Sequence, residues 1–124
     1  MKLCSIASGS SGNCIFAGSE TTSLLIDAGI SGRTAQKVSE KLSVIAGRRQ
    51  VICITHLPQI AAMADSHFEI EKQVEGTKTT TQIHPLDEEA SIRELARLLG
   101  GAQITGAVLE NAREMKKLAR ECKA

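Results

Sequence analysis

The sequence predicts an α/β fold, in which a mainly parallel sheet with flanking helices is joined to a polar β-hairpin. From about residue 30 onward, apolar strand-like stretches alternate with segments of helical period. The apolar run at 51–55 shows no polar alternation, which is typical of a parallel strand buried on both faces. Two amphipathic segments of helical period complete the chain. Together these observations predict a sheet covered by helices.

Three strand-like stretches come first, at residues 3–7, 14–17 and 22–27, and turn-forming Gly, Ser and Asn residues separate them. Apolar residues then recur at helical spacing over residues 35–45. A helix here would carry the chain from the strand at 22–27 back to the strand at 51–55. We therefore expect these two strands to form the base of the parallel sheet.

The second half of the chain begins with a short helix opened by Pro58. Alternating apolar and Glu residues, a Glu-Gly turn and a threonine-rich run predict a half-exposed hairpin over residues 68–84, with threonines on its solvated face. Two amphipathic helices are expected at about 92–99 and 108–122.

Length and composition limit the possible functions. The 124 residues suit one domain, and an apolar fraction of 42% argues against global disorder. Two Phe and no Tyr or Trp leave no aromatic platform on which single-stranded nucleic acid could stack. A net charge of +1 provides no overall attraction to nucleic acid or membrane. We see no signal peptide and no membrane-spanning run, so we expect a cytoplasmic protein without a membrane partner.

Two local patterns are interpreted as structural. The four cysteines lie far apart with no CxxC pair, which argues against a metal site. Two of them lie inside apolar strand-like runs, which favours small buried side chains in a reducing compartment. Glutamates interleave with the basic pair Lys116-Lys117, as expected of a solvated helix surface. Arg48-Arg49 is a second short basic cluster. We therefore assign no nucleic-acid interface to either pair.

Four segments resemble the C-terminal end of the RecN family of bacterial DNA repair ATPases. They are residues 27–36 (Asp-Ala-Gly-Ile-Ser-Gly-Arg-Thr-Ala-Gln), 54–59 (Ile-Thr-His-Leu-Pro-Gln), 64–68 (Ala-Asp-Ser-His-Phe) and 93–101. They occur in the family's order and spacing. The resemblance extends over residues 27–124 and includes about three quarters of the chain.

This resemblance implies a lobe of an ABC-type and SMC-like ATPase that acts in DNA repair and recombination. His56 matches the switch histidine that contacts the γ-phosphate of ATP. The implied cofactors are ATP and Mg²⁺, and the implied partners of the complete protein are a second copy and DNA. The nucleotide and interface loop would contain Asp27, Gly29, Ser31 and Gly32.

The first thirty residues resemble a different family. Residues 1–29 are similar to the opening strands and turns of a metallo-β-lactamase-fold hydrolase. Both families have a segment close to Asp-x-Gly-Ile-Ser-Gly, so a junction is expected at 27–32. The predicted organisation is therefore a chimera, with a β-strand segment at 1–30 and a RecN-like lobe at 31–124.

The catalytic parts of an ATPase are missing from the sequence. The Gly-Ser-Ser-Gly-Asn turn at 9–13 is not followed by the Lys-Ser/Thr of a P-loop. Leu24 and Leu25 occupy the positions of the family's Asp-Glu pair, which would hold the metal and the attacking water. Asp27 could replace a carboxylate, although a strand-end turn explains it as well. We therefore expect the chain to be inactive alone and to need a P-loop lobe.

Two alternatives remain open, a noncatalytic α/β remnant and a stub of a metallo-β-lactamase-fold hydrolase. The hydrolase would need a His-x-His-x-Asp-His zinc cluster, which the sequence lacks. His56, His67 and His84 are too widely spaced to replace it. We expect no metal site, and we interpret His67 and His84 as flanking residues of a solvated hairpin.

Overall fold

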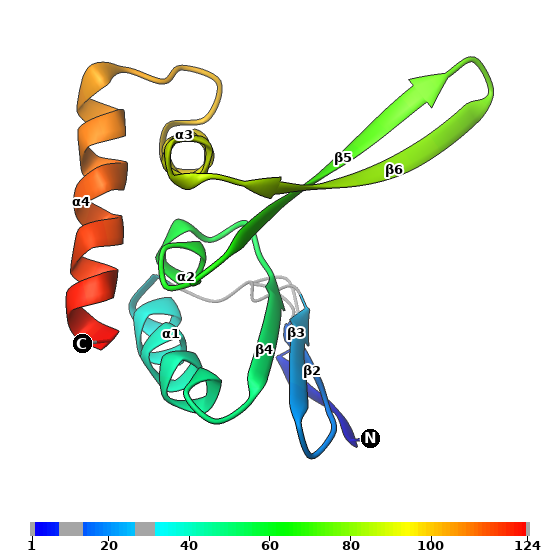
Figure 1. Cartoon of the computed structure of the whole chain (residues 1–124), viewed down its shortest axis with the longest axis vertical. Helices are drawn as coiled ribbons and strands as arrows, with labels where there is room; N and C mark the ends of the chain where they lie inside the picture. The colour runs from blue at the N-terminus through cyan, green and yellow to red at the C-terminus, as the bar shows by residue number, and fades with distance from the viewer. Residues whose placement is uncertain (1, 8–13, 27–31, 124) are drawn as a thin grey trace.

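The computed structural model describes residues 2–7, 14–26 and 32–123 and has a mixed α/β fold (Figure 1). A four-stranded sheet and one helix form one part, and a long hairpin and three further helices form the other. The elements are, in order, β1 (Lys2–Ala7), β2 (Cys14–Gly18), β3 (Thr22–Ile26), α1 (Gly32–Ala46), β4 (Gln50–Ile54), α2 (Pro58–Ala61), β5 (His67–Glu75), β6 (Lys78–Leu86), α3 (Glu88–Gly100) and α4 (Gly106–Lys123).

The larger sheet has the order β1-β2-β3-β4, and the prediction of a mainly parallel sheet is wrong. β1 pairs with β2, and β2 with β3, in antiparallel fashion, whereas only β3 and β4 are parallel. The connections explain the difference. Residues 19–21 join β2 to β3, and a link this short can only reverse the chain. Only the link through α1 is long enough to return the chain in the same direction.

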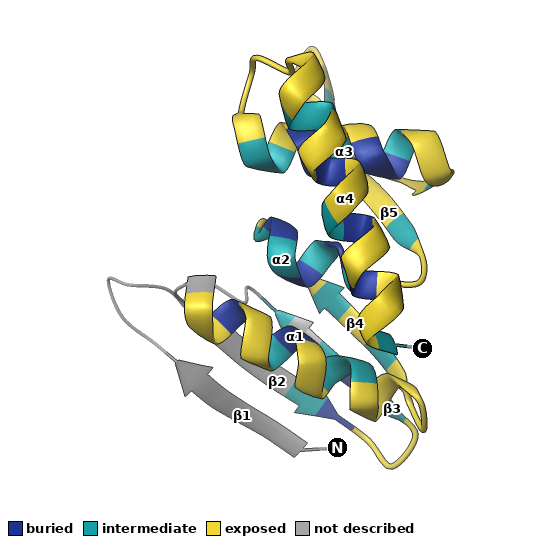
Figure 2. Cartoon of the chain, turned by 90° about the vertical axis from the view of Figure 1, so that its left-hand side faces the viewer, coloured by how far each residue is buried: buried dark blue, intermediate teal, exposed yellow. Residues whose placement is uncertain are grey.

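Helix α1 packs on one face of the sheet (Figure 2). Ala35 and Ile60 are buried together with the partly buried Cys53 of β4. On the opposite face, Ile52 and Ile54 are each 47% exposed. The prediction that this strand is buried on both faces is therefore wrong for this chain. Its residues alternate between the face covered by α1 and an exposed face, because no described helix covers the second face.

The hairpin β5–β6 is confirmed, and it is longer than expected. Nine residue pairs join the two strands, from His67–Leu86 to Glu75–Lys78. Gly76 forms the turn with a φ of 61°, a conformation that costs glycine little. The expectation of a half-exposed hairpin is wrong, because its apolar residues are exposed as well as its threonines.

A second group of buried apolar residues, separate from Ala35 and Ile60, lies between the helices α2, α3 and α4. Figure 2 shows the buried residues of α3 and α4 on the sides where these helices meet. Three small residues, Ala96, Ala112 and Ala119, are at most 6% exposed and allow close approach of the backbones. Leu95 is the largest fully buried apolar side chain in the described part of the chain. None of the helices described combines the length and apolar character that crossing a bilayer requires.

A buried lysine links α4 to α3, which corrects the interpretation of Lys116-Lys117 as a solvated pair. Lys116 is 6% exposed, and its Nζ donates hydrogen bonds to Glu88 Oε2 at 2.9 Å and to Ser91 Oγ. Arg120 donates to the other oxygen of Glu88 at 2.6 Å. A buried charge is tolerated when it is paired and hydrogen-bonded in this way. Lys117, by contrast, is exposed.

Replacing Lys116 should destabilise the chain far more than replacing its neighbour. Lys116→Ala removes a buried aliphatic stem and leaves Ser91 and Glu88 without their shared donor, which should cost about 2 kcal/mol. Lys117→Ala changes helix propensity equally but should stay within about 0.5 kcal/mol of the parent. Urea unfolding followed by circular dichroism measures both free energies of unfolding. Equal losses in the two variants would contradict the structural role of Lys116.

Candidate functional site

Two neighbouring strands end at one edge of the sheet. Ile26, the last residue of β3, lies opposite Ile54, the last residue of β4, and the strands run in parallel. Thr55 and His56 follow directly after β4. The carboxyl ends of adjacent parallel strands are the common place for ligand sites in α/β proteins. This edge is therefore the candidate functional site.

The turn that carries His56 is held by local hydrogen bonds. Thr55 Oγ1 accepts a hydrogen bond from the Leu57 backbone N–H at 3.0 Å. Leu57 is extended, with φ −88° and ψ 117°, as expected of a residue that precedes proline. Pro58 then opens α2, and the Leu57 carbonyl accepts from the Ala61 N–H at 3.0 Å. The backbone on both sides of His56 is thus fixed, and the imidazole is exposed at the edge.

The structure places only part of the predicted loop. Gly32 is the first residue of α1, whereas Asp27, Gly29 and Ser31 lie outside the described residues. The turn at 9–13 also lies outside them. Leu24, at one of the two positions expected to hold carboxylates, is half-buried within β3 opposite Ile52. An aliphatic side chain there supplies no ligand for a metal ion.

The side chain of Gln59, close to His56, was not predicted to be unusual from the sequence. The Gln59 amide oxygen is buried, and it has no hydrogen-bond partner among the described residues. Buried polar atoms are normally paired, so this acceptor is unusual. Gln59 is the second residue of α2 and lies three positions after His56. Such burial depends on the packing of α2 and cannot be read from the residue type.

The three histidines are not brought together as a ligand set. His67 is half-buried, and its Nε2 lies 2.7 Å from the Ala61 carbonyl oxygen, which joins β5 to α2. The interpretation of His67 as a solvated flanking residue is therefore wrong. His84 is exposed on β6 opposite Glu69. Among the residues described, no group of three or more His, Cys, Asp or Glu side chains could hold a metal ion.

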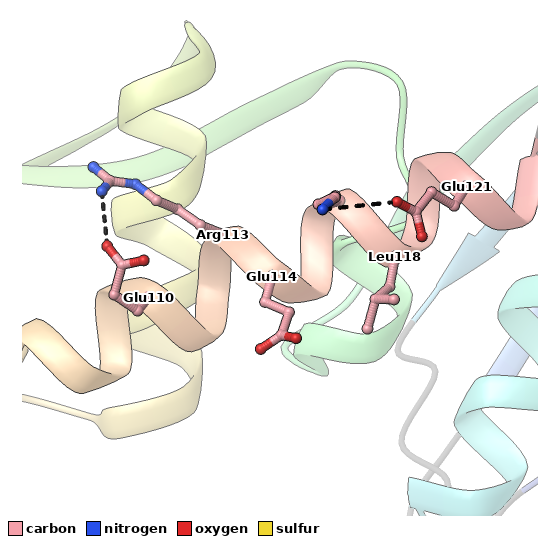
Figure 3. A pocket seen from close by; sticks show the side chains of 6 residues that line it. Glu110, Arg113, Glu114, Leu118 and Glu121 are labelled. Carbon is pink, nitrogen blue, oxygen red and sulfur yellow. Dashed lines mark hydrogen bonds and ion pairs between the residues drawn. The ribbon is translucent and has the colours of Figure 1, made fainter.

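The outer face of α4 carries ion pairs and no enclosed site. Figure 3 shows Glu110 paired with Arg113, at 3.0 Å, along the same helix. Lys117 and Glu121 lie 4.0 Å apart one turn further on. Pairs between exposed side chains of one helix contribute little to stability and create no binding site. This outer face supports the interpretation of a solvated surface.

The comparisons with known proteins identify relatives of this chain. No family model matches it. Over 98 residues, or 79% of its length, the chain is 41% identical to a protein of Bacillus subtilis named DNA repair protein RecN. Proteins of the same name from Vibrio cholerae and Deinococcus radiodurans are 46% and 44% identical over 77% and 79% of the chain.

The chain is similar to a segment of DNA repair protein RecN. It spans only 17–18% of the length of these relatives. The similarity to RecN predicted from the four sequence segments is confirmed. The comparisons give no support to the interpretation of the first thirty residues as part of a metallo-β-lactamase-fold protein or of the chain as a chimera.

Acidification should lower the stability of the fold through His67, which lies between β5 and α2. Burial lowers the pKa of His67 from its ordinary value of 6.5, and the Ala61 carbonyl opposes this only in part. The folded state therefore favours the neutral imidazole. As the pH falls through 6.5, the unfolded chain takes up the proton first, so stability falls until the folded-state pKa is passed.

Urea unfolding between about pH 7.5 and about pH 5 measures this effect, above the range in which Glu88 becomes protonated. His67→Asn should reduce the slope of stability against pH. The control His84→Asn, which changes an exposed imidazole on the neighbouring strand, should keep the slope of the parent. An unchanged slope in His67→Asn would show that the burial of His67 is not linked to protonation.

Proposed function

We propose that the chain is part of the ATP-binding unit of a RecN-type DNA repair and recombination ATPase, in which His56 contacts the γ-phosphate. The observation that carries the proposal is the position of His56. It lies exposed two residues after β4, at the edge where the parallel strand β3 also ends. Phosphate groups of nucleotides are commonly bound at such strand ends.

The chemistry of the site suits a phosphate sensor better than a complete catalyst. An imidazole N–H can donate a hydrogen bond to a phosphate oxygen. The turn held by Thr55 and Pro58 fixes the backbone from which His56 projects. Hydrolysis of ATP also needs a P-loop, Mg²⁺ and carboxylates. Leu24 and Leu25 supply no carboxylate. ATP and Mg²⁺ are therefore expected to bind only when the rest of the ATPase is present.

The free edge of β4 supports a role for a missing P-loop lobe as the partner. Among the described strands, β4 pairs only with β3, so no described strand lies along its other edge. Ile52 and Ile54 lie exposed on the same strand. An open edge with apolar side chains is a template for another strand. We propose that a strand of the P-loop lobe pairs here and completes the nucleotide site next to His56.

The remaining partners follow from the same assignment. The loop that contains Asp27, Gly29 and Ser31, and that ends at Gly32, would face the nucleotide held by a second copy. In this arrangement residues 31–124 act as the RecN-like lobe. DNA would be bound by the assembled dimer and not by this chain alone.

Replacement of His56 in a complete ATPase tests the proposal. Residues 27–124 of this chain would replace the matching segment of B. subtilis RecN, which keeps its own remaining residues. His56→Ala should lower the rate of ATP hydrolysis about 100-fold, the typical effect of losing one donor to a developing charge. His84→Ala, an exposed histidine on the hairpin, is the control and should leave the rate unchanged. The isolated 124-residue chain should hydrolyse ATP only at background rate.

Equal rates for the parent hybrid and His56→Ala would rule out a γ-phosphate role for this histidine. Hydrolysis by the isolated chain above background would contradict the requirement for a P-loop lobe.

A further inference from the structure

The β5–β6 hairpin has one apolar face and one polar face. Side chains alternate along each strand, and the register pairs residues that share a face. The acidic residues of β5 alternate with its apolar residues and therefore occupy the opposite face. The apolar face consists of Phe68, Ile70, Lys72, Val74, Thr79, Thr81, Ile83 and Pro85. The opposite face contains Glu69, Glu71, Glu75, His84 and Gln82.

The apolar face is uncovered over most of its length. Phe68, Ile70, Val74 and Ile83 are between 54% and 68% exposed. The hairpin is joined to the helices near its base and projects away from them toward its tip (Figure 1). A two-stranded hairpin standing alone in water is marginally stable. A contiguous row of large apolar side chains on such an element marks a surface that another element covers.

A second copy of this chain is a poor occupant for the apolar face. Lys72 lies between Ile70 and Val74, and this face has no acidic side chain. A symmetric face-to-face dimer would therefore enclose two Lys72 ammonium groups with no carboxylate to pair them. The apolar face is also too small for a stable dimer by itself, since stable interfaces use about 20–30 residues from each partner.

Residues outside this chain, but within the same type of protein, are the better occupant. The chain spans only 17–18% of the length of its relatives. A covalently linked segment can dock on a small surface, because its effective concentration is high. The covering segment must also supply an acceptor for Lys72, because the charge of this lysine needs a partner when the apolar face around it is covered.

We propose that the apolar hairpin face is a docking surface for the remainder of a RecN-type protein, which covers it with apolar side chains and a carboxylate opposite Lys72. This inference rests on the assignment of the chain to a RecN-type ATPase. It concerns a surface separate from the β4 edge, and it makes the hairpin a second point of attachment.

Thiol labelling on the two faces tests the docking directly. Ile70→Cys lies on the apolar face and Glu71→Cys on the opposite face, and both positions are exposed in this chain. Each variant is treated with a maleimide in the isolated 124-residue chain and in the hybrid with B. subtilis RecN. Peptide mapping separates these thiols from the native cysteines. In the hybrid, labelling of Ile70→Cys should slow at least 10-fold, while labelling of Glu71→Cys should change less than 2-fold.

The outcomes separate this inference from the proposed function. Fast labelling of Ile70→Cys in a hybrid whose ATPase activity depends on His56 would overturn the docking surface and leave the function intact. Slow labelling of Ile70→Cys in a hybrid whose ATP hydrolysis is unaffected by His56→Ala would support the docking surface and contradict the proposed role of His56. If the hybrid does not fold, the remainder of B. subtilis RecN is supplied as a separate chain, and absence of protection there overturns the inference.

Two further results bear on the occupant. Concentration-dependent protection of Ile70→Cys in the isolated chain, together with a dimer in sedimentation, would assign the face to a second copy and overturn the inference. In the hybrid, Lys72→Glu should restore fast labelling of Ile70→Cys, because it places a carboxylate against a carboxylate. Continued protection of Ile70→Cys in the Lys72→Glu hybrid would contradict a carboxylate opposite Lys72.

Discussion

The packing of α1 against β4 and α2 is the interaction on which the candidate site depends. Ala35 of α1 is fully buried against Ile60 of α2, with Cys53 of β4 beside them. This contact holds the helix that returns the chain from β3 to β4 in parallel. It also fixes the start of α2 just after His56. Together with the pairing of β3 and β4, this contact sets the position of the chain around His56.

Two uncovered apolar surfaces have one common explanation. Ile52 and Ile54 face solvent on β4, and the hairpin exposes Phe68, Ile70 and other large apolar side chains. A complete domain normally buries such residues, because removing apolar surface from water is the main favourable term in folding. The chain is similar to about a sixth of a longer protein. Both surfaces are thus expected where a segment meets the rest of its fold.

Local signals in the sequence predicted the elements well, and long-range packing explains the failures. Helical spacing, turns and threonine content placed the helices and the hairpin that the structure describes, because these patterns depend on residues close in sequence. Burial of 51–55 on both faces was wrong, because the second face has no cover in this chain. Lys116 and His67 were misjudged because only the packing of the helices shows that Lys116 is buried and His67 half-buried. The position of His56 was predicted from the end of a strand. The burial of the Gln59 amide oxygen could not be predicted from the sequence.

Nuclear magnetic resonance of the histidine side chains in the hybrid ATPase tests the central claim most directly. The account predicts that the imidazole resonances of His56 shift when a nonhydrolysable ATP analogue with Mg²⁺ is added, and not when ADP is added. The resonances of His84, on the exposed hairpin strand, should stay unchanged in both cases. Identical spectra of His56 with the ATP analogue and with ADP would contradict a γ-phosphate sensor at the end of β4.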